Sequence, residues 1–221
     1  MSLRLLLFYT VIFLMGWRAM AQQESLSTKY REDQFYISFG LQLQKEKISG
    51  FKQNGFSNNF QIGFVRDISL SSNGRTAIGL GLGYGYSRLI SNLNFDSEGK
   101  LHNFSITDNE ENRQTFSSLV VPFSFRLRSS TLDRTDFWRV YGGVKYMFNF
   151  AENYNPFYGN SFQSDFIRKK NSAVFLSIGY NTWNIFFEYD LNSIYQKDIA
   201  FTDGNYPQLH TLKLGLIFYI L

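Results

Sequence analysis

Apolar residues at every second position, in eight separate segments, constrain the fold of this chain more than any other feature. In 35–44, Phe35, Ile37 and Phe39 project to one face of an extended chain, whereas Tyr36 and Ser38 project to the other. A period of two is the pattern of a β-strand. With no convincing helix after residue 21, the alternation predicts strands at about 35–45, 60–69, 76–90, 115–128, 137–150, 172–181, 185–192 and 209–220.

The connections between these segments alternate in length. The short ones carry turn residues, as in Ser71 to Gly74 and Asn181 to Asn184. Outer-membrane barrels combine short periplasmic turns with long external loops, and an even strand number brings both termini to the periplasm. The pattern therefore predicts an all-β, eight-stranded antiparallel up-and-down transmembrane barrel. The long connections, rich in Asn, Ser, Asp, Glu and Lys, are 46–59, 91–114, 151–171 and 193–208.

A secreted soluble barrel of the lipocalin kind also alternates, and the third segment distinguishes the two. Its one face carries Leu80, Leu82 and Tyr84, and its other face carries a ladder of glycines from Gly79 to Gly85. A soluble barrel has to cover its outside with charged residues, which a glycine ladder cannot do. Glycines suit a crowded lumen, where they make room for large neighbours. The apolar face is therefore predicted to point to lipid.

Aromatic residues support this orientation, since they gather at the two edges of a lipid-facing band. One group falls near the strand ends that lead into long loops, and another falls near the short turns. The predicted external girdle is Tyr84, Tyr86, Tyr146, Phe148 and Tyr189, and the predicted periplasmic girdle is Trp138, Tyr180, Trp183 and Phe218.

The first 21 residues have the pattern of an export signal. Arg4 precedes an apolar run from Leu5 to Trp17, and Ala19-Met20-Ala21 provides a small-x-small cleavage site. The alternative is a membrane anchor helix, but the run is shorter than the ~20 residues needed to span the hydrocarbon. We therefore expect a signal peptide at 1–21 and an outer-membrane barrel domain at 22–221.

Composition removes several classes of protein. There is no cysteine, which excludes a disulfide framework, a thiolate zinc site, a cysteine nucleophile and an amino-terminal lipid-modified cysteine. The net charge of +4 falls to +2 without Arg4 and Arg18, which is too small an excess for a nucleic-acid partner.

The face predicted to line the barrel carries five cations and two acids. Buried charges persist only when they are paired or hydrated. Glu188 and Asp190 lie two residues apart on one strand, and Lys213 on the next strand is their nearest cation by sequence. Eight strands leave an interior just wide enough for side chains, so this network is either a plug that ties strands together, or an anion path or a contact for peptide. The predicted lumen charge network is Arg126, Arg128, Arg139, Lys145, Glu188, Asp190 and Lys213.

The search for catalytic and metal-binding patterns is mostly negative. His102 and His210 lie on the long-loop side, which is compatible with the surface Ser-His-acid arrangement of lipid-modifying barrel enzymes. Ser105 and Asp108 accompany His102, but a charged exposed loop supplies such neighbours by default. The glycine ladder has no following helix and so is no dinucleotide site. The sequence predicts no cofactor, no metal and no enzymatic activity.

The central hairpin resembles that of PorT-type outer-membrane barrels of the Bacteroidota. Segment 119–126 has a proline near the outer half of a strand, and 138–146 has the aromatic-Gly-Gly-x-x-Tyr pattern that follows it in that family. The last strand, 213–221, is similar to the carboxy-terminal assembly signal of such barrels, with Ile220 and Leu221 in place of the usual aromatic. The resemblance spans the mature chain, and the flanking segments that agree in layout are 60–64, 175–179 and 186–189.

The resemblance implies an outer-membrane location, and the founding member of the family is linked to the type IX secretion system. A shared fold does not fix function, so that role comes to this chain by analogy. We expect a structural or accessory role in secretion or envelope assembly, with outer-membrane lipid and envelope or secretion proteins as partners. The alternatives are a narrow channel for small solutes or ions and a lipid-modifying enzyme.

Overall fold

The structure is a computed structural model that describes residues 33–45, 49–53, 55–98, 101–107, 111–129, 138–196, 200–201 and 208–220. The predicted signal peptide at 1–21 lies outside the described residues. No helix among the described residues is long and apolar enough to cross a membrane.

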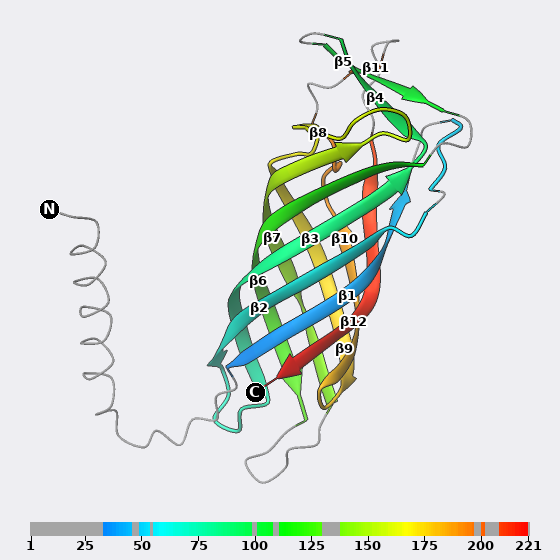
Figure 1. The fold of residues 1–221 in the computed structure, drawn as a ribbon. Helices are drawn as coiled ribbons and strands as arrows, with labels where there is room; N and C mark the ends of the chain where they lie inside the picture. Colours follow the sequence, from blue (N-terminus) through cyan, green and yellow to red (C-terminus); the bar gives the residue numbers. More distant parts are fainter. Residues whose placement is uncertain are drawn as a thin grey trace, which may run out of the picture.

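Eight long strands form one closed antiparallel barrel (Figure 1). Each strand pairs with its neighbours in the chain, β1 also pairs with β12, and the pairing of β6 with β7 completes the ring. The predicted fold is confirmed. The barrel strands are β1 Gln34–Lys45, β2 Asn58–Ser69, β3 Thr76–Ser91, β6 Asn112–Arg128, β7 Trp138–Asn155, β9 Lys170–Tyr180, β10 Trp183–Asp190 and β12 His210–Ile220.

The strands are strongly tilted, as Figure 1 shows, because the pairing is staggered around the ring. Leu43 on β1 pairs with Leu212, and the same row of partners passes around the barrel to Arg66 on β2. On β1, Gln34 pairs with Val65, so the next residue of β2, Arg66, lies opposite Asp33. The row that left β1 at Leu43 therefore returns to it at Asp33, which gives the barrel a stagger of ten residues (43 − 33). An eight-stranded barrel of this kind has an interior that side chains fill.

The alternating side chains place apolar residues outside and polar residues inside. Leu80 and Phe123 are 51% and 47% exposed on the outer wall, whereas Gln61 and Ser124 are buried in the lumen. This confirms the predicted direction of the apolar face. The predicted girdle residues also point outward, and at the turn end they pair as Trp138 with Tyr180 and Trp183 with Phe218.

The glycine ladder makes room for large lumen side chains. A Cβ atom on Gly83 would collide with the Tyr36 hydroxyl, and one on Gly79 would lie 2.6 Å from Arg126 Nε. Gly63 faces the same Tyr36 ring from β2. The glycines therefore let two of the largest lumen residues fit inside a narrow ring of strands.

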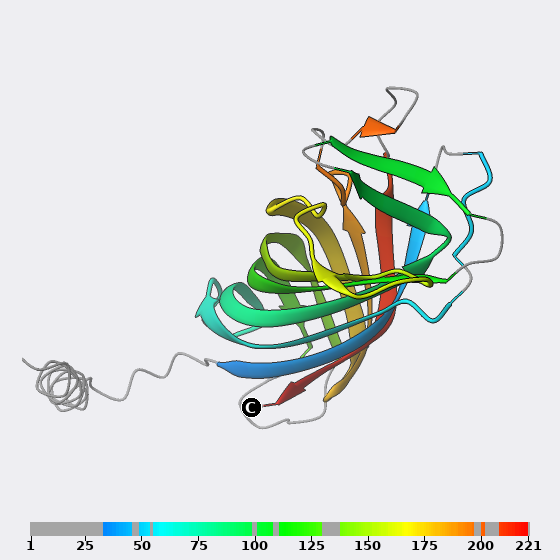
Figure 2. The ribbon, with the colours of Figure 1, turned by 45° about the horizontal axis from the view of Figure 1, so that its top comes forward.

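The end of the barrel that carries the long connections, here called the loop end, holds further strands (Figure 2). β4 Leu93–Glu98 and β5 Leu101–Ile106 form a hairpin, and β11 Ala200–Phe201 pairs in parallel with β5. β8 Phe162–Gln163 pairs with the end of β7. Three of the long segments predicted to be polar loops therefore contain β-structure, because their scattered apolar residues face a common core.

Strand β7 runs five residues beyond its predicted end at 150, and a β-bulge explains the difference. Thr115 pairs with Asn153 but Ser117 pairs with Phe150, so Ala151 and Glu152 together oppose one residue of β6. Ala151 adopts a φ of 50°, the left-handed conformation found in such bulges. The extra residue shifts the alternation and turns Glu152 inward. The end of the strand therefore does not follow a strict period of two in the sequence.

Candidate functional site in the barrel interior

A first group of lumen charges lies near the short turns, and we call Asp67, Arg126 and Arg128 the turn-end cluster. The Asp67 carboxylate accepts a hydrogen bond from Arg126 Nη1 on one oxygen and from Arg128 Nη1, at 2.6 Å, on the other. Gln34 Oε1 also accepts from Arg126, at 3.0 Å. All of these side chains are buried. One carboxylate therefore ties β2 to β6 from inside the ring.

Aromatic rings cover the guanidinium group of Arg126. Its Cζ atom lies 4.3 Å from the ring centroid of Tyr141 and 5.5 Å from that of Tyr219. Because the two rings also contact each other edge to face, they close the lumen beside the cluster.

A second group of charges lies nearer the centre of the barrel, and we call Lys145, Glu188, Asp190 and Lys213 the middle cluster. Glu188 accepts from Lys145 Nζ at 2.5 Å and from Lys213 Nζ at 2.7 Å, one lysine on each oxygen. Lys213 Nζ also lies 3.3 Å from Asp190 Oδ1. Gln61 Oε1 accepts from Lys145 at 2.9 Å. These contacts connect strands on different sides of the ring, as a brace requires.

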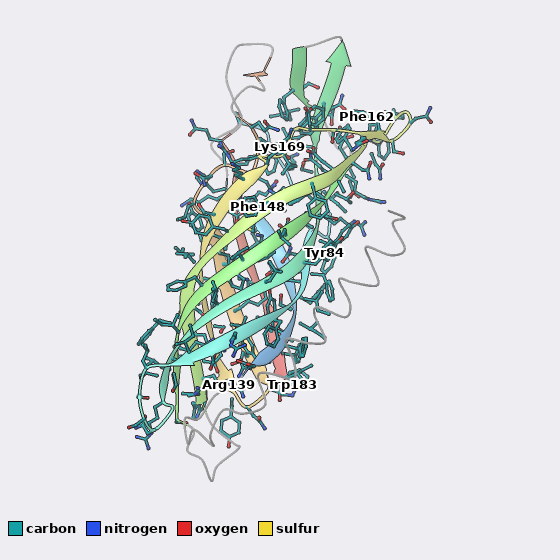
Figure 3. All side chains as sticks on the ribbon, turned by 90° about the vertical axis from the view of Figure 1, so that its left-hand side faces the viewer. Tyr84, Arg139, Phe148, Phe162, Lys169 and Trp183 are labelled. Atoms are coloured by element: carbon teal, nitrogen blue, oxygen red, sulfur yellow. The ribbon has the colours of Figure 1, made fainter. Side chains whose placement is uncertain are left out.

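The seven charged residues predicted to line the lumen are all buried. Six of them fall into the two clusters. Arg139 lies at the turn end, close to Trp183 in the view of Figure 3, and donates to the backbone carbonyl of Asn181 at 2.5 Å.

Little space remains around the middle cluster and Arg126, whereas an open hollow of about 440 Å³ lies beside Arg128 at the turn end. One cavity between the middle cluster and the loop end, lined in part by Asn59, Met147 and Lys213, has about 10 Å³, and one beside Tyr36 and Arg126 has about 20 Å³. A cavity of roughly 10–15 Å³ holds about one water molecule. The charges of the two clusters are therefore compensated mainly by ion pairs with one another.

An apolar core closes the mouth of the barrel at the loop end. Phe95 of β4 lies at its centre, stacked on Phe166 at 4.3 Å between ring centroids and tilted against Phe104 at 4.1 Å. The Tyr154 ring approaches Phe95 edge-on at 4.8 Å. This mouth core consists of Phe51, Leu89, Leu93, Phe95, Phe104, Phe116, Tyr154, Phe166, Ile167, Ile194, Tyr195 and Leu209.

Glu152, turned inward by the bulge, fastens one segment over the mouth core. Its carboxylate accepts hydrogen bonds from the backbone N–H groups of Phe166 and Ile167, at 3.1 and 2.9 Å. It also accepts from the Ser164 hydroxyl at 2.7 Å and the Gln114 amide at 2.6 Å. Glu152 lies on the loop side of Phe148 and Phe150, which point outward from the wall. Burial raises the pKa of its carboxyl, although the four hydrogen bonds act in the opposite direction.

Two acids of this interior were missed by the sequence reading. Asp67 lies an even number of residues from Gln61 and Val65 on β2, so it is on the same face of the strand and the alternation alone places it in the lumen. Glu152 gave no comparable signal, because the bulge precedes it.

The histidines form no catalytic group within the described part of the chain. His210 stacks on Tyr189, and its Nδ1 lies 3.2 Å from the carbonyl oxygen of Asp190. The side chain of His102 lies outside what the structure describes. No group of three or more His, Cys, Asp or Glu residues that could hold a metal ion occurs among the described residues.

A closed barrel with an apolar outer wall and a charged, filled interior defines a β-barrel membrane protein. The chain belongs to the outer membrane protein beta-barrel domain family, whose model matches residues 20–195. No curated protein matches the sequence.

Two solved structures of Ail, the attachment invasion locus protein of Yersinia pestis, are similar to this chain. One, in complex with the heparin analogue sucrose octasulfate, has 13% identity and a TM-score of 0.41, over 86% of this chain and 99% of that chain. The other has 12% identity and a TM-score of 0.38, over 85% and 97%.

Proposed function

We propose that this outer-membrane barrel is a non-conducting structural protein, which carries a folded β-surface on the outside of the cell and serves as an accessory for other envelope or secretion proteins. The observation that carries the proposal is the closed interior. The turn-end cluster, the middle cluster and the mouth core occupy successive levels of the lumen. A barrel filled at three levels is suited to hold its external segments in place, not to pass solutes.

The external segments are suited to contact a partner because they are ordered by the barrel itself. The mouth core fixes the β4–β5 hairpin, and Glu152 fixes the segment from Phe162 to Ile167. A surface fixed in this way loses little conformational entropy when a partner binds. The resemblance of the central hairpin to PorT-type barrels supports secretion of the type IX kind as the process served, and the signal-peptide pattern of residues 1–21 supports cleavage before Gln22.

Purification from native outer membranes after mild cross-linking tests this proposal. We expect a stoichiometric envelope or secretion protein to co-purify with the wild-type chain and to be lost with Glu152→Gln, which releases one external segment. Purification of the barrel alone, with no stoichiometric partner in several membrane preparations, would contradict an accessory role.

A narrow anion path is the second candidate, and the charge balance of the lumen favours it. The two clusters and Arg139 hold five cations against three acids, an excess of two positive charges. Such a path requires the mouth core to open. It predicts conductance that changes when Lys145 is neutralised, whereas the structural proposal predicts no conductance.

A further inference from the structure

The outer wall changes character sharply at the loop end of β3, β6 and β7. Two successive rows of paired residues are mainly apolar, namely Tyr84–Leu119–Phe148 and Tyr86–Ser117–Phe150. Figure 3 shows Tyr84 and Phe148 on this wall, with Lys169 beyond Phe148. The next row outward is polar, and it consists of Asn58, Arg88, Thr115 and Asn153.

Two arginines lie together in this polar zone. Arg88 pairs with Thr115, and Arg113 precedes Thr115 by two residues on the same face of β6. Arg88 and Arg113 are therefore diagonal neighbours on the outer wall, a relation within reach of long side chains. Arg113 is exposed and Arg88 is half-buried.

Neither arginine has a hydrogen-bond or ion-pair partner among the described residues. The Nε atom of Arg88 is buried and unpaired. A buried donor without a partner and two like charges side by side are both unfavourable, and one bound anion relieves both. The pair thus has the charge and the free donor groups of an anion-binding site.

Most of the charged side chains described around the pair are positive. Among the residues outside the lumen at this end whose side chains the structure describes, the acids are Glu111 and Asp165, and the cations are Lys45, Lys52, Arg88, Arg113, Arg168, Lys169 and Lys170. Cations therefore outnumber acids among the side chains described at this end of the barrel.

We propose that Arg88 and Arg113 bind a phosphate group of the outer-leaflet lipid. The long loops of outer-membrane barrels face the outside, and aromatic rows mark the level of the headgroups, so the pair lies where the phosphates of that leaflet lie. Guanidinium groups bind phosphate through two parallel hydrogen bonds. The occupant is a lipid rather than free phosphate because the site continues the lipid-facing wall. This inference is independent of any role in secretion.

Binding of a phosphorylated glycolipid of the lipid A type to the full mature chain in uncharged detergent tests the proposal, with native mass spectrometry as the readout. We expect Arg88→Gln/Arg113→Gln to weaken binding by at least about tenfold. Arg66→Gln is the matched control, because it removes an outward cation near the turn end of β2, far from the loop end that carries the pair. It is expected to leave binding unchanged. Heat-dependent gel migration confirms that each variant is folded, and Arg113→Gln alone serves if the double variant is not.

Three results would overturn the proposal. The first is wild-type affinity in the double variant, or in Arg113→Gln where that variant replaces it. The second is equally strong binding of the same lipid without phosphate. The third is a loss of binding in Arg66→Gln as large as that in the double variant. Full competition by an excess of inorganic phosphate would assign the site to free phosphate and would overturn the lipid as occupant. Weaker binding of the phosphorylated lipid at high salt, with no effect of salt on its phosphate-free form, would support the proposal.

Discussion

Glu188 and Lys213 face each other directly in the pairing of β10 with β12, and their charged atoms lie 2.7 Å apart inside the barrel. The second oxygen of Glu188 pairs with Lys145, which comes from β7. One carboxylate therefore compensates two buried cations that belong to strands far apart in the ring.

Replacement of Glu188 by Gln should destabilise the barrel by about 3 kcal/mol or more, because two buried lysines lose their counter-charge. Unfolding in denaturant, followed by the shift in gel migration, measures the loss. Ser38→Ala, another lumen position whose hydroxyl has no partner in the described structure, should change stability little. Equal stability of wild type and Glu188→Gln would contradict the brace, and altered ion passage at unchanged stability would favour the anion path.

A charge on the outer wall should oppose membrane insertion. Leu82 is 57% exposed and points outward between the Arg66–Leu80 pair and the aromatic rows. Leu82→Arg should cost about 2–4 kcal/mol if the site lies near the bilayer midplane, because an arginine there has neither water nor a partner. Folding yield into lipid vesicles is the measurement, with Leu82→Met as the control. A wild-type yield for Leu82→Arg would mean that this face does not meet lipid.

The docking of the segment over the mouth core should depend on pH through Glu152. The pKa of its carboxyl is raised above the ordinary 4.5, so the folded state holds the proton more tightly than the released segment does. Docking is therefore strongest below pH 4.5 and weakens as the pH rises from there through the raised pKa.

Hydrogen exchange at Phe166 and Ile167 measures this effect. Glu152→Gln should abolish the pH dependence and increase opening by about 1–3 kcal/mol at neutral pH, since an amide cannot satisfy four donors. Glu111→Gln, at an exposed carboxyl, is the control. Protection that follows the same pH curve in Glu152→Gln would contradict the assignment.

The amino terminus of the protein isolated from outer membranes should be Gln22. Mass spectrometry of the intact chain tests this cleavage, since removal of 1–21 also removes Arg4 and Arg18. A purified chain that still begins at Met1 would contradict an export signal.

The barrel was predictable from the sequence because outward apolar residues alternate with inward residues along its strands. Leu80 and Gly79 already show which face meets lipid, and parity alone brings Glu188, Asp190 and Lys213 together on adjacent strands. Parity also places Asp67 in the lumen, so the partner of Arg126 and Arg128 was available to the same reasoning.

The loop end was not predictable in the same way. The bulge at Ala151 reverses the alternation, and nothing in the local pattern says that Glu152 then points inward. The mouth core joins Phe95, Phe166 and Leu209 from segments far apart in the chain. Each segment is polar on average, so its few apolar residues do not indicate a core by themselves. They form one only because the barrel brings the segments together.

Ion passage through the purified mature chain in planar bilayers tests the central claim most directly. The ion-paired clusters and the mouth core predict no discrete conductance for the wild-type protein at any applied voltage that the bilayer tolerates. Reproducible discrete steps whose size or selectivity changes in Lys145→Gln or Arg126→Gln would contradict a filled, structural barrel and would establish the lumen as an anion path.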